Sequence, residues 1–314
     1  MIVYRELSSV EKQLGFSART LYGLSNSISK HYISVKIPKR NGGVRRLSIP
    51  DKALMSVQKA IAQKLLAYEP VSSYAKAYKP DSNVKKNAAP HIAKPKILKL
   101  DIKDFFDNIK YSTVKDKVFP SEKYSEANRI LLAMLCYHED SLPQGAPTSP
   151  IITNIIMREF DEAVGQRFGE KNIAYTRYCD DMTFSGDFDE MQVISFVEEE
   201  LKKLTLSLNR KKTHVISSSS RQTVTGITVN KKLNIPKEYK RRIRQEIFFC
   251  KKNGTEGHIE NIASELSPLK YLHSLQGKIN YVLQITPENE EFKSYKKEIA
   301  ELIKAYEFKA QQER

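Results

Sequence analysis

The chain has 314 residues, of which 40% are hydrophobic and 28% charged. This composition is ordinary for a globular protein and excludes a fibrous or wholly disordered chain. Its 52 Lys and Arg outnumber its 37 Asp and Glu and give a net charge of +15, which predicts a polyanionic partner, with nucleic acid favoured over a membrane surface. A single core rarely grows to this length, so we expect two or three domains.

Cysteine content and the N-terminus indicate a cytoplasmic protein. Three cysteines, an odd number, cannot form a disulfide framework, and the sequence has no C-x-x-C pair for zinc. The N-terminus becomes charged within its first few residues, unlike a secretory signal. No apolar run approaches the roughly 20 residues of a membrane-spanning helix. We therefore expect a reducing compartment and no membrane partner.

In the first third of the chain, the hydrophobic pattern changes from helical to alternating. The first thirty residues have the leucine spacing of helices. Apolar residues alternate over 32–50 around an Asn-Gly pair, which predicts a β-hairpin with a basic tip. A helix follows, with Asp51 as its N-cap. Residues 70–95 are basic and rich in turns, with a helix around 81–92.

The rest of the chain contains a β-rich part and then a helical part. We place a domain boundary near 235, because the pattern after 237 is helical only. The predicted elements before it are a buried strand at 97–102, a helix beginning within 108–119, helices on both sides of the loop 141–150, two short strands within 172–186 that meet at Cys179–Asp181, an amphipathic helix at 189–204, and paired strands within 213–235 interrupted by the serines 217–220.

Three carboxylates are the strongest chemical feature. Asp101 ends a predicted strand, and Asp180 and Asp181 lie in a hairpin turn, where adjacent carboxylates repel each other unless a cation neutralises them. With Asp101 from a neighbouring strand, they would form an oxygen-ligand site for Mg²⁺. Two such ions, about 3.5–4 Å apart, would activate a hydroxyl and stabilise a leaving pyrophosphate. An Asp-Asp pair alone is more often a solvated turn, so the surrounding motifs decide.

Six motifs occur in family order around these carboxylates. Four resemble the palm motifs of reverse transcriptases: Asp101-Ile102-Lys103-Asp104-Phe105-Phe106, the loop 142–150 (LPQGAPTSP), Tyr178-Cys179-Asp180-Asp181, and 209–213 (NRKKT). Two more, 87–91 (NAAPH) and 224–226 (VTG), resemble signatures of bacterial retron reverse transcriptases. The resemblance extends from about Arg45 to Gly226.

The resemblance implies an α+β fold of the right-hand polymerase type, with fingers, palm and thumb. We expect N-terminal helices and fingers at 1–95, a palm with an antiparallel sheet at 96–234, a finger-derived insert at 110–140, and a basic helical thumb at 235–314.

The same resemblance assigns the active-site residues. Asp101, Asp180 and Asp181 would be catalytic and would bind two Mg²⁺ ions, with Mn²⁺ as a possible substitute and the Ile102 carbonyl as a further ligand. The residues assigned to the nucleotide are Arg45 and Lys39 at the triphosphate, Phe106 as an aromatic gate against a 2′-hydroxyl, Gln144 in the pocket, and Lys211 at the phosphates, with Lys212 as the open alternative.

A third group of residues is assigned to RNA and primer. Asn87 and His91, four positions apart, share one face if their segment is helical, and both are assigned to RNA, with a structural hydrogen bonder as the open alternative for His91. The other members are Val224, Thr225 and Gly226 beside the primer, and Lys240, Arg241 and Arg244 on a cationic thumb helix. The aromatic residues expected in the thumb core are Tyr239, Phe248, Phe249, Tyr271 and Tyr281.

One position departs from the commonest family pattern. Cys179 replaces the usual Ala in the motif around Asp180 and Asp181. Because its side chain is also small, we expect activity to survive, and the reaction needs no cysteine nucleophile.

The resemblance implies an RNA-directed DNA polymerase that uses deoxynucleoside triphosphates. Retron enzymes copy part of a structured non-coding RNA, prime from a 2′-hydroxyl within it, and produce RNA-linked single-stranded DNA. The family is linked to anti-phage defence with an effector protein. The residues after Asn230 suffice for a thumb but leave no room for a ribonuclease H domain, so RNA in the RNA–DNA hybrid would be removed by a separate enzyme.

Two alternatives remain open. One is a reverse transcriptase of the group II intron or diversity-generating kind, which the signatures at 87–91 and 224–226 disfavour. The other is an RNA-binding scaffold that restrains a toxic effector, which the three intact aspartates disfavour.

Overall fold

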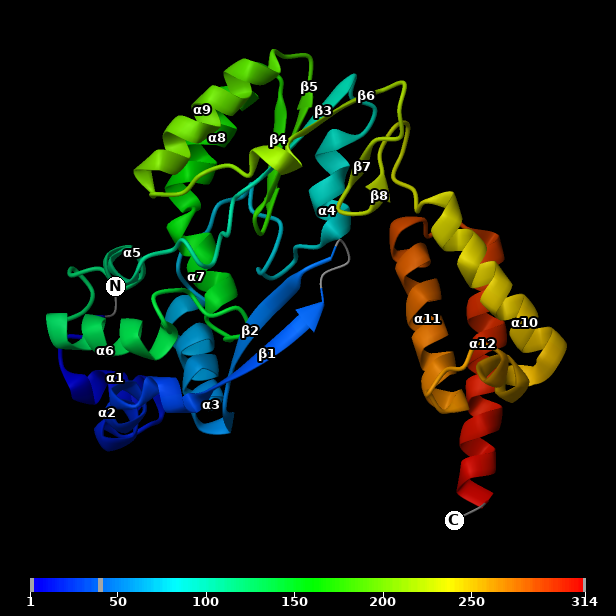
Figure 1. Cartoon of the computed structure of the whole chain (residues 1–314), viewed down its shortest axis with the longest axis horizontal. Coiled ribbons are helices and arrows are strands. Elements are labelled where there is room, and N and C mark those ends of the chain that lie inside the picture. The colour runs from blue at the N-terminus through cyan, green and yellow to red at the C-terminus, as the bar shows by residue number, and fades with distance from the viewer. Residues whose placement is uncertain (1–2, 39–41, 313–314) are drawn as a thin grey trace. The chain divides into compact units, whose positions relative to one another are not determined.

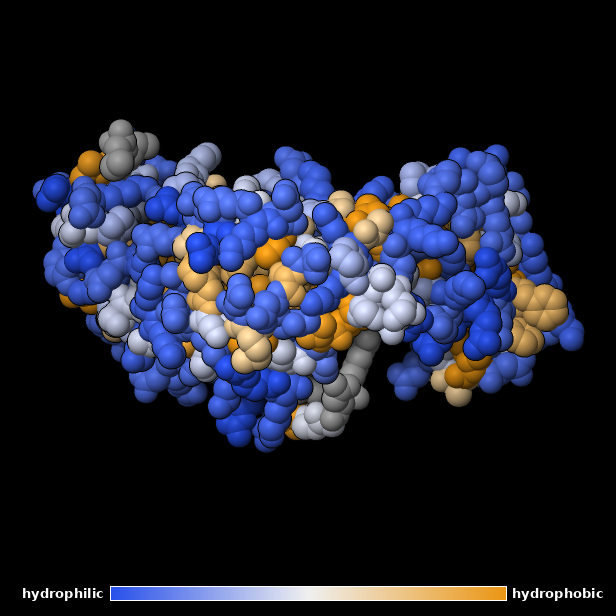
Figure 2. All heavy atoms as spheres, turned by 90° about the horizontal axis from the view of Figure 1, so that it is seen from above, coloured by the Kyte–Doolittle hydropathy of each residue, from blue (hydrophilic) through white to orange (hydrophobic). Residues whose placement is uncertain are grey.

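The computed structural model describes residues 3–38 and 42–312, which form two compact units, Met1–Ser217 and Ser218–Arg314 (Figure 1). The chain becomes purely helical only near Lys237, so a short stretch of β-structure belongs to the second unit. Within the described residues, no helix has both the length and the hydrophobicity needed to cross a bilayer. On the face shown in Figure 2, hydrophilic residues predominate.

The first unit begins with the predicted helices and hairpin. Strands β1 (Tyr32–Pro38) and β2 (Val44–Pro50) pair antiparallel. Lys39, which was assigned to the triphosphate, lies outside the described residues. The predicted N-cap is confirmed, because Asp51 accepts a hydrogen bond of 2.9 Å from the backbone N–H of Leu54. The helical elements around the hairpin are α1 (Leu7–Leu14), α2 (Ala18–Asn26), η1 (Ile28–His31), α3 (Lys52–Ala60) and the π-helical turn η2 (Ile61–Leu66).

An antiparallel sheet with strand order β4-β5-β3-β6 lies at the centre of the first unit. A turn at Cys179–Asp180 joins β4 to β5. The buried strand predicted at 97–102 and the two short strands predicted within 172–186 are confirmed. The strands are β3 (Lys96–Asp101), β4 (Ala174–Tyr178), β5 (Asp181–Gly186) and β6 (His214–Ser217).

The two faces of this sheet have different surroundings. Side chains alternate between faces along a strand, so the pairing of Asp101 with Asp181 places both on one face, whereas Arg177 lies on the other. Helices α8 (Arg158–Gly169) and α9 (Glu190–Lys203) cover the Arg177 face (Figure 1). Aromatic packing holds them there: the Phe168 ring lies 5.5 Å from both Phe184 of β5 and Phe196 of α9.

Short helices complete the first unit. The helix predicted around 81–92 is shorter and ends as a 3₁₀ turn, and the helix predicted within 108–119 begins at Tyr111. These elements are α4 (Val84–Ala88), η3 (Ala89–His91), α5 (Tyr111–Thr113), η4 (Val114–Val118), α6 (Glu126–Cys136), α7 (Ser149–Ile156) and η5 (Arg210–Lys212).

The second unit is a small β-ribbon followed by three helices. The paired strands predicted within 213–235 belong to two sheets, because β6 pairs with β3 and β7 pairs with β8. Tyr271 is buried as predicted, but Phe248 and Phe249 are 57% and 40% exposed, so placing them in the core was wrong. The elements are β7 (Thr223–Val224), β8 (Ile227–Thr228), α10 (Lys237–Asn261), α11 (Pro268–Ile285) and α12 (Glu290–Gln312).

Candidate active site

The three predicted carboxylates come together at one end of the central sheet. Asp101, the last residue of β3, pairs with Asp181, the first residue of β5, and Asp180 precedes it in the turn. Paired residues of antiparallel strands have Cα atoms about 4.5–5.5 Å apart. The backbone N–H of Ile102 donates to the carbonyl oxygen of Asp180 over 3.1 Å and fixes the turn against the end of β3. Residues eighty positions apart in sequence therefore share one site.

The turn between β4 and β5 is strained at Cys179. Its φ is 62°, and that of Asp180 is not positive, the φ pattern of a type II′ turn, which favours glycine at its first central position. For another residue, left-handed backbone costs roughly 1–2 kcal/mol. Burial raises the pKa of the Cys179 thiol to about 12, so the thiol stays protonated at neutral pH. The small Cys179 side chain is therefore buried within the turn, and its protonated thiol gives no support to a nucleophilic role.

The carboxylates destabilise one another's charge. Burial, together with the charges of Asp180 and Asp101, raises the pKa of Asp181 to about 6. Burial also raises the pKa of Asp101, whereas the hydrogen bond from the Lys212 ammonium lowers it. Lys99 lies on the same sheet face. Burial lowers its pKa, and the charge of Asp181 raises it again in part. The site has excess negative charge that a cation would stabilise.

The donor set fits a divalent cation. Carboxylate oxygens are the ligands that Mg²⁺ prefers, and the mutual repulsion of these three groups is relieved by an ion between them. In the described part of the chain, no three His, Cys, Asp or Glu side chains enclose a metal position as they stand, and Asp101 binds the Lys212 ammonium instead. The residues that would hold the ion are Asp101, Asp180 and Asp181.

The loop that carries Gln144 lies against the β-hairpin that carries Arg45. The Gln144 carbonyl accepts a hydrogen bond of 3.1 Å from the N–H of Ser48 in β2. A Cβ on Gly145 would lie 2.8 Å from the Ser48 carbonyl oxygen, so only glycine permits this approach. The predicted nucleotide loop therefore adjoins the strand that carries Arg45, whose side chain is exposed.

The two adjacent phenylalanines differ in exposure. Phe105 is buried in the core at 3% exposed, whereas Phe106 is only partly buried. This arrangement agrees with the expectation that one ring is core and that Phe106 is the one available to a substrate.

Lys212, rather than Lys211, faces the carboxylates. Lys212 Nζ donates to Asp101 Oδ2 over 2.8 Å, and this bond raises the pKa of the ammonium. The assignment of Lys211 is therefore corrected to the alternative that the sequence left open. Which of the two lysines reaches Asp101 depends on the 3₁₀ turn η5, in which neighbouring side chains point in different directions.

Comparison with known proteins agrees with this geometry. A profile of the reverse transcriptase (RNA-dependent DNA polymerase) family matches residues 37–233. The retron Mx65 reverse transcriptase of Myxococcus xanthus is 30% identical, over 92% of this chain and 70% of that protein. The chain belongs to the retron reverse transcriptases. It is therefore an RNA-directed DNA polymerase, an enzyme of a family that uses divalent metal ions and an RNA template.

Two enzymes of Escherichia coli are further relatives in the same family. The retron Ec83 and Ec86 enzymes of Escherichia coli are 30% and 29% identical, each over 84% of this chain, and the matches span 86% and 84% of those proteins. Among solved structures, apo telomerase from Candida tropicalis aligns with a TM-score of 0.45 and 12% identity over 86% of this chain and 63% of that chain. That match adds nothing to the assignment.

The first retron signature is internal to the enzyme. His91 is fully buried, with Nδ1 2.7 Å from Ser185 Oγ and Nε2 2.8 Å from Thr176 Oγ1, and Asn87 is only 1% exposed. The prediction that these side chains contact RNA is wrong, because neither reaches the surface. The alternative kept open for His91, a structural hydrogen bonder, is confirmed: it fastens η3 onto β4 and β5.

The second retron signature forms the turn of the β-ribbon. Val224 is fully buried, so its side chain cannot touch a primer, and this part of the expectation is wrong. Thr225 and Gly226 form the two-residue turn, with φ of 45° and 81°, and Gly226 is exposed. The signature therefore fixes a tight turn and leaves its tip as the part that can meet nucleic acid.

The three cationic residues of α10 that were assigned to nucleic acid differ in exposure and in their hydrogen bonds. Arg241 is exposed. Arg244 forms two hydrogen bonds, of 2.6 and 2.7 Å, with Glu291, and Lys240 donates to Asn234 over 3.0 Å. Burial lowers the pKa of Lys240, and the neighbouring Arg244 lowers it further. Arg241 is thus the most available of the three to a phosphate.

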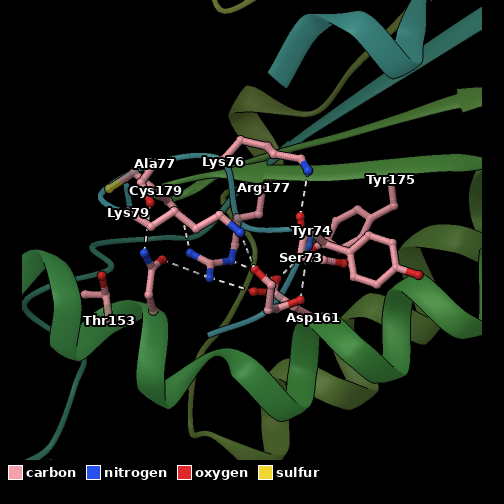
Figure 3. Close-up of polar contacts among 12 residues, drawn as sticks. Ser73, Tyr74, Lys76, Ala77, Lys79, Thr153, Asp161, Tyr175, Arg177 and Cys179 are labelled. Carbon is pink, nitrogen blue, oxygen red and sulfur yellow. Dashed lines mark hydrogen bonds and ion pairs between the residues drawn. The ribbon is translucent and has the colours of Figure 1, made fainter. Parts of the chain in front are cut away.

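Sequence reasoning missed a buried ion pair behind the carboxylates. Arg177 of β4 and Asp161 of α8 are both fully buried and form a salt bridge of 2.6 Å (Figure 3). An Arg in a short strand is normally taken for a surface residue. Its position next to Tyr178 was the only available signal, and nothing in the sequence pointed to Asp161.

Proposed function

We propose that this enzyme copies part of a structured non-coding RNA into single-stranded DNA that stays joined to the RNA through a branch at a 2′-hydroxyl. The observation that carries the polymerase part is the pairing of Asp101 with Asp181, next to Asp180, at the end of an antiparallel sheet. The retron assignment supports the branched product.

The proposed site holds two Mg²⁺ ions, or Mn²⁺ in their place, on Asp101, Asp180, Asp181 and the Ile102 carbonyl. When bound, such ions lower the pKa of the attacking hydroxyl and stabilise the leaving pyrophosphate. The protein's own groups position the substrates. Lys212 and Arg45 would bind the triphosphate, for which a guanidinium is suited because its planar donors pair with two oxygens.

Selection of the sugar is assigned to Phe106. Its partly exposed ring, which follows the catalytic strand, would clash with a 2′-hydroxyl and admit deoxynucleotides. Gln144 would line the same pocket, held by its backbone bond to Ser48.

The remaining chain is proposed to hold nucleic acid. Residues 1–95 would form the N-terminal helices and the fingers, residues 96–234 the palm with a finger-derived insert at 110–140, and residues 235–314 the thumb. Thr225, Gly226 and Arg241 would meet the RNA–DNA hybrid. An effector protein, a separate ribonuclease H and a role in anti-phage defence complete the proposal and follow from the retron assignment.

Sequencing of the nucleic acid that co-purifies with the enzyme tests this proposal. The expected product is an RNA covalently joined to a short DNA of unique sequence, which a debranching enzyme separates. Recovery of bulk cellular RNA without attached DNA would contradict it. The Asp180→Asn, Asp181→Asn double variant is the matched control and should retain the RNA but carry no DNA.

A further inference from the structure

The guanidinium of Arg177 lies fully buried on the sheet face opposite the catalytic carboxylates. Its Nε and Nη2 donate to the two carboxylate oxygens of Asp161 over 2.8 and 2.6 Å, and Nη2 also lies 3.3 Å from Asn154 Oδ1. Figure 3 shows Asp161 facing the guanidinium from the helix beneath. This two-pronged pairing fixes the plane of the guanidinium.

The partners of Arg177 are themselves held in place. Asp161 Oδ1 also accepts a hydrogen bond of 2.8 Å from the hydroxyl of Tyr175, and Asn154 donates to the carbonyl of Ala77 over 2.8 Å. Main-chain bonds of Arg177 to Tyr74 and Lys76 add the segment 74–77 to the edge of β4. The guanidinium is therefore oriented by the consecutive helices α7 and α8, and α7 is in turn bonded to the distant segment 74–77.

The remaining guanidinium nitrogen is directed at the catalytic turn. Arg177 Nη1 donates to the carbonyl oxygen of Cys179 over 2.9 Å. Cys179 is the residue with left-handed backbone, and its carbonyl belongs to the peptide that leads into Asp180. Since the Ile102 N–H binds the carbonyl of Asp180, the two successive peptides that follow Cys179 and Asp180 are both fixed from outside the turn.

We propose that Arg177, oriented by Asp161, is a positioning residue that holds the strained turn in the conformation from which Asp180 and Asp181 act. A buried ion pair is often no better for stability than apolar residues of similar volume, so its presence here calls for another role. Holding one carbonyl in a fixed direction is such a role, which no apolar pair could supply. This inference rests on the proposed function of the two aspartates.

The test replaces the pair without leaving a buried charge. The Arg177→Met, Asp161→Leu double variant removes both charges at similar volume. Its melting temperature should fall, because the Tyr175 hydroxyl and the Cys179 carbonyl lose their partners, but the variant should stay folded at the assay temperature. Its single-turnover rate of nucleotide incorporation should fall by at least about tenfold, with the dNTP KM within about twofold of wild type. The Mg²⁺ concentration for half-maximal rate should rise. Loss of stability alone would lower the fraction of enzyme that reacts. It would change neither the single-turnover rate constant nor the Mg²⁺ concentration for half-maximal rate.

A matched control is the Glu69–Lys123 ion pair, which lies outside this network. The Glu69→Leu, Lys123→Met double variant should keep the wild-type rate and Mg²⁺ dependence. If the Arg177 double variant does not fold, Arg177→Lys decides, because an ammonium can pair with Asp161 but lacks the planar fork that also reaches the Cys179 carbonyl.

The outcomes separate the two proposals. A wild-type rate and Mg²⁺ dependence in the folded double variant, or in Arg177→Lys where the double variant does not fold, overturns the positioning role. If Asp180→Asn is inactive in the same assay, the proposed function stands while this inference fails. If Asp180→Asn is fully active, the proposed function itself fails.

Discussion

The ammonium of Lys212 lies 2.8 Å from Asp101 Oδ2, although 111 positions separate the two residues. Asp101 is nearly buried, whereas the Lys212 side chain is 59% exposed, so the lysine reaches the carboxylate from the solvent side. The ammonium neutralises the carboxylate in this structure, and in the proposed function it would release Asp101 and bind the triphosphate. Lys211, its neighbour, has no such contact among the interactions of the described residues.

Lys212→Ala should therefore lower kcat/KM for dNTP by about tenfold to a hundredfold, which corresponds to the loss of one hydrogen bond to a charged group. Lys211→Ala is the matched control and should change it by less than about twofold. Steady-state primer extension on an RNA template measures both. Equal losses in the two variants would contradict the assignment of Lys212.

Phe106→Ala should relax the choice of sugar. Removal of a ring beside the ribose position opens space for a 2′-hydroxyl, so incorporation of ribonucleotides relative to deoxynucleotides should rise by at least about tenfold. Competition between a dNTP and its matching rNTP measures the ratio. Phe105→Leu, in the adjacent core position, should lower the melting temperature without changing that ratio. A ratio unchanged in Phe106→Ala would remove Phe106 as the gate.

His91 should make the stability of the enzyme depend on pH. Burial, together with the charge of Lys94, lowers the pKa of His91 to about 3, so the folded protein holds the neutral imidazole. The stabilisation is fully present above the ordinary pKa of about 6.5 and is lost as pH falls from there towards 3, by about 1.4 kcal/mol per pH unit.

Urea unfolding of wild type and His91→Gln at several pH values tests this dependence. The difference in free energy of unfolding between the two should shrink below pH 6.5, because glutamine does not titrate. His214→Gln, at an exposed position, should instead follow the wild-type curve. A difference between wild type and His91→Gln that is constant with pH would show that His91 is not held neutral.

Substitutions of Cys179 should separate backbone strain from thiol chemistry. Cys179→Ala should keep the incorporation rate within about twofold, because the side chain stays small and the thiol has no chemical role. Cys179→Val should lower it markedly, because a β-branched residue tolerates positive φ poorly. Primer extension with folded protein compares the two. A large loss in the alanine variant would indicate that the thiol itself contributes.

The sequence predicted those features that depend on local patterns. Local patterns predicted the strand that ends near Asp101 and the turn at Asp180 and Asp181, but only the resemblance to reverse transcriptase motifs brought the three carboxylates into one site. The Asn-Gly pair predicted the hairpin that carries Arg45. The sequence did not predict the contacts that depend on the packing of distant elements. His91 is buried because η3 lies on β4 and β5, and Arg177 is buried because α8 brings Asp161 beneath it. Neither partner is marked by a local pattern.

The most direct test of the central claim is the single-turnover rate of nucleotide incorporation at saturating Mg²⁺ in Asp101→Asn, Asp180→Asn and Asp181→Asn, with Asp107→Asn, an exposed position nearby, as the control. Each amide keeps the shape of the side chain but removes the charge that would hold a divalent ion. The account predicts losses of at least about a thousandfold in the three variants and none in the control. A rate within about tenfold of wild type in any of the three folded variants would contradict it.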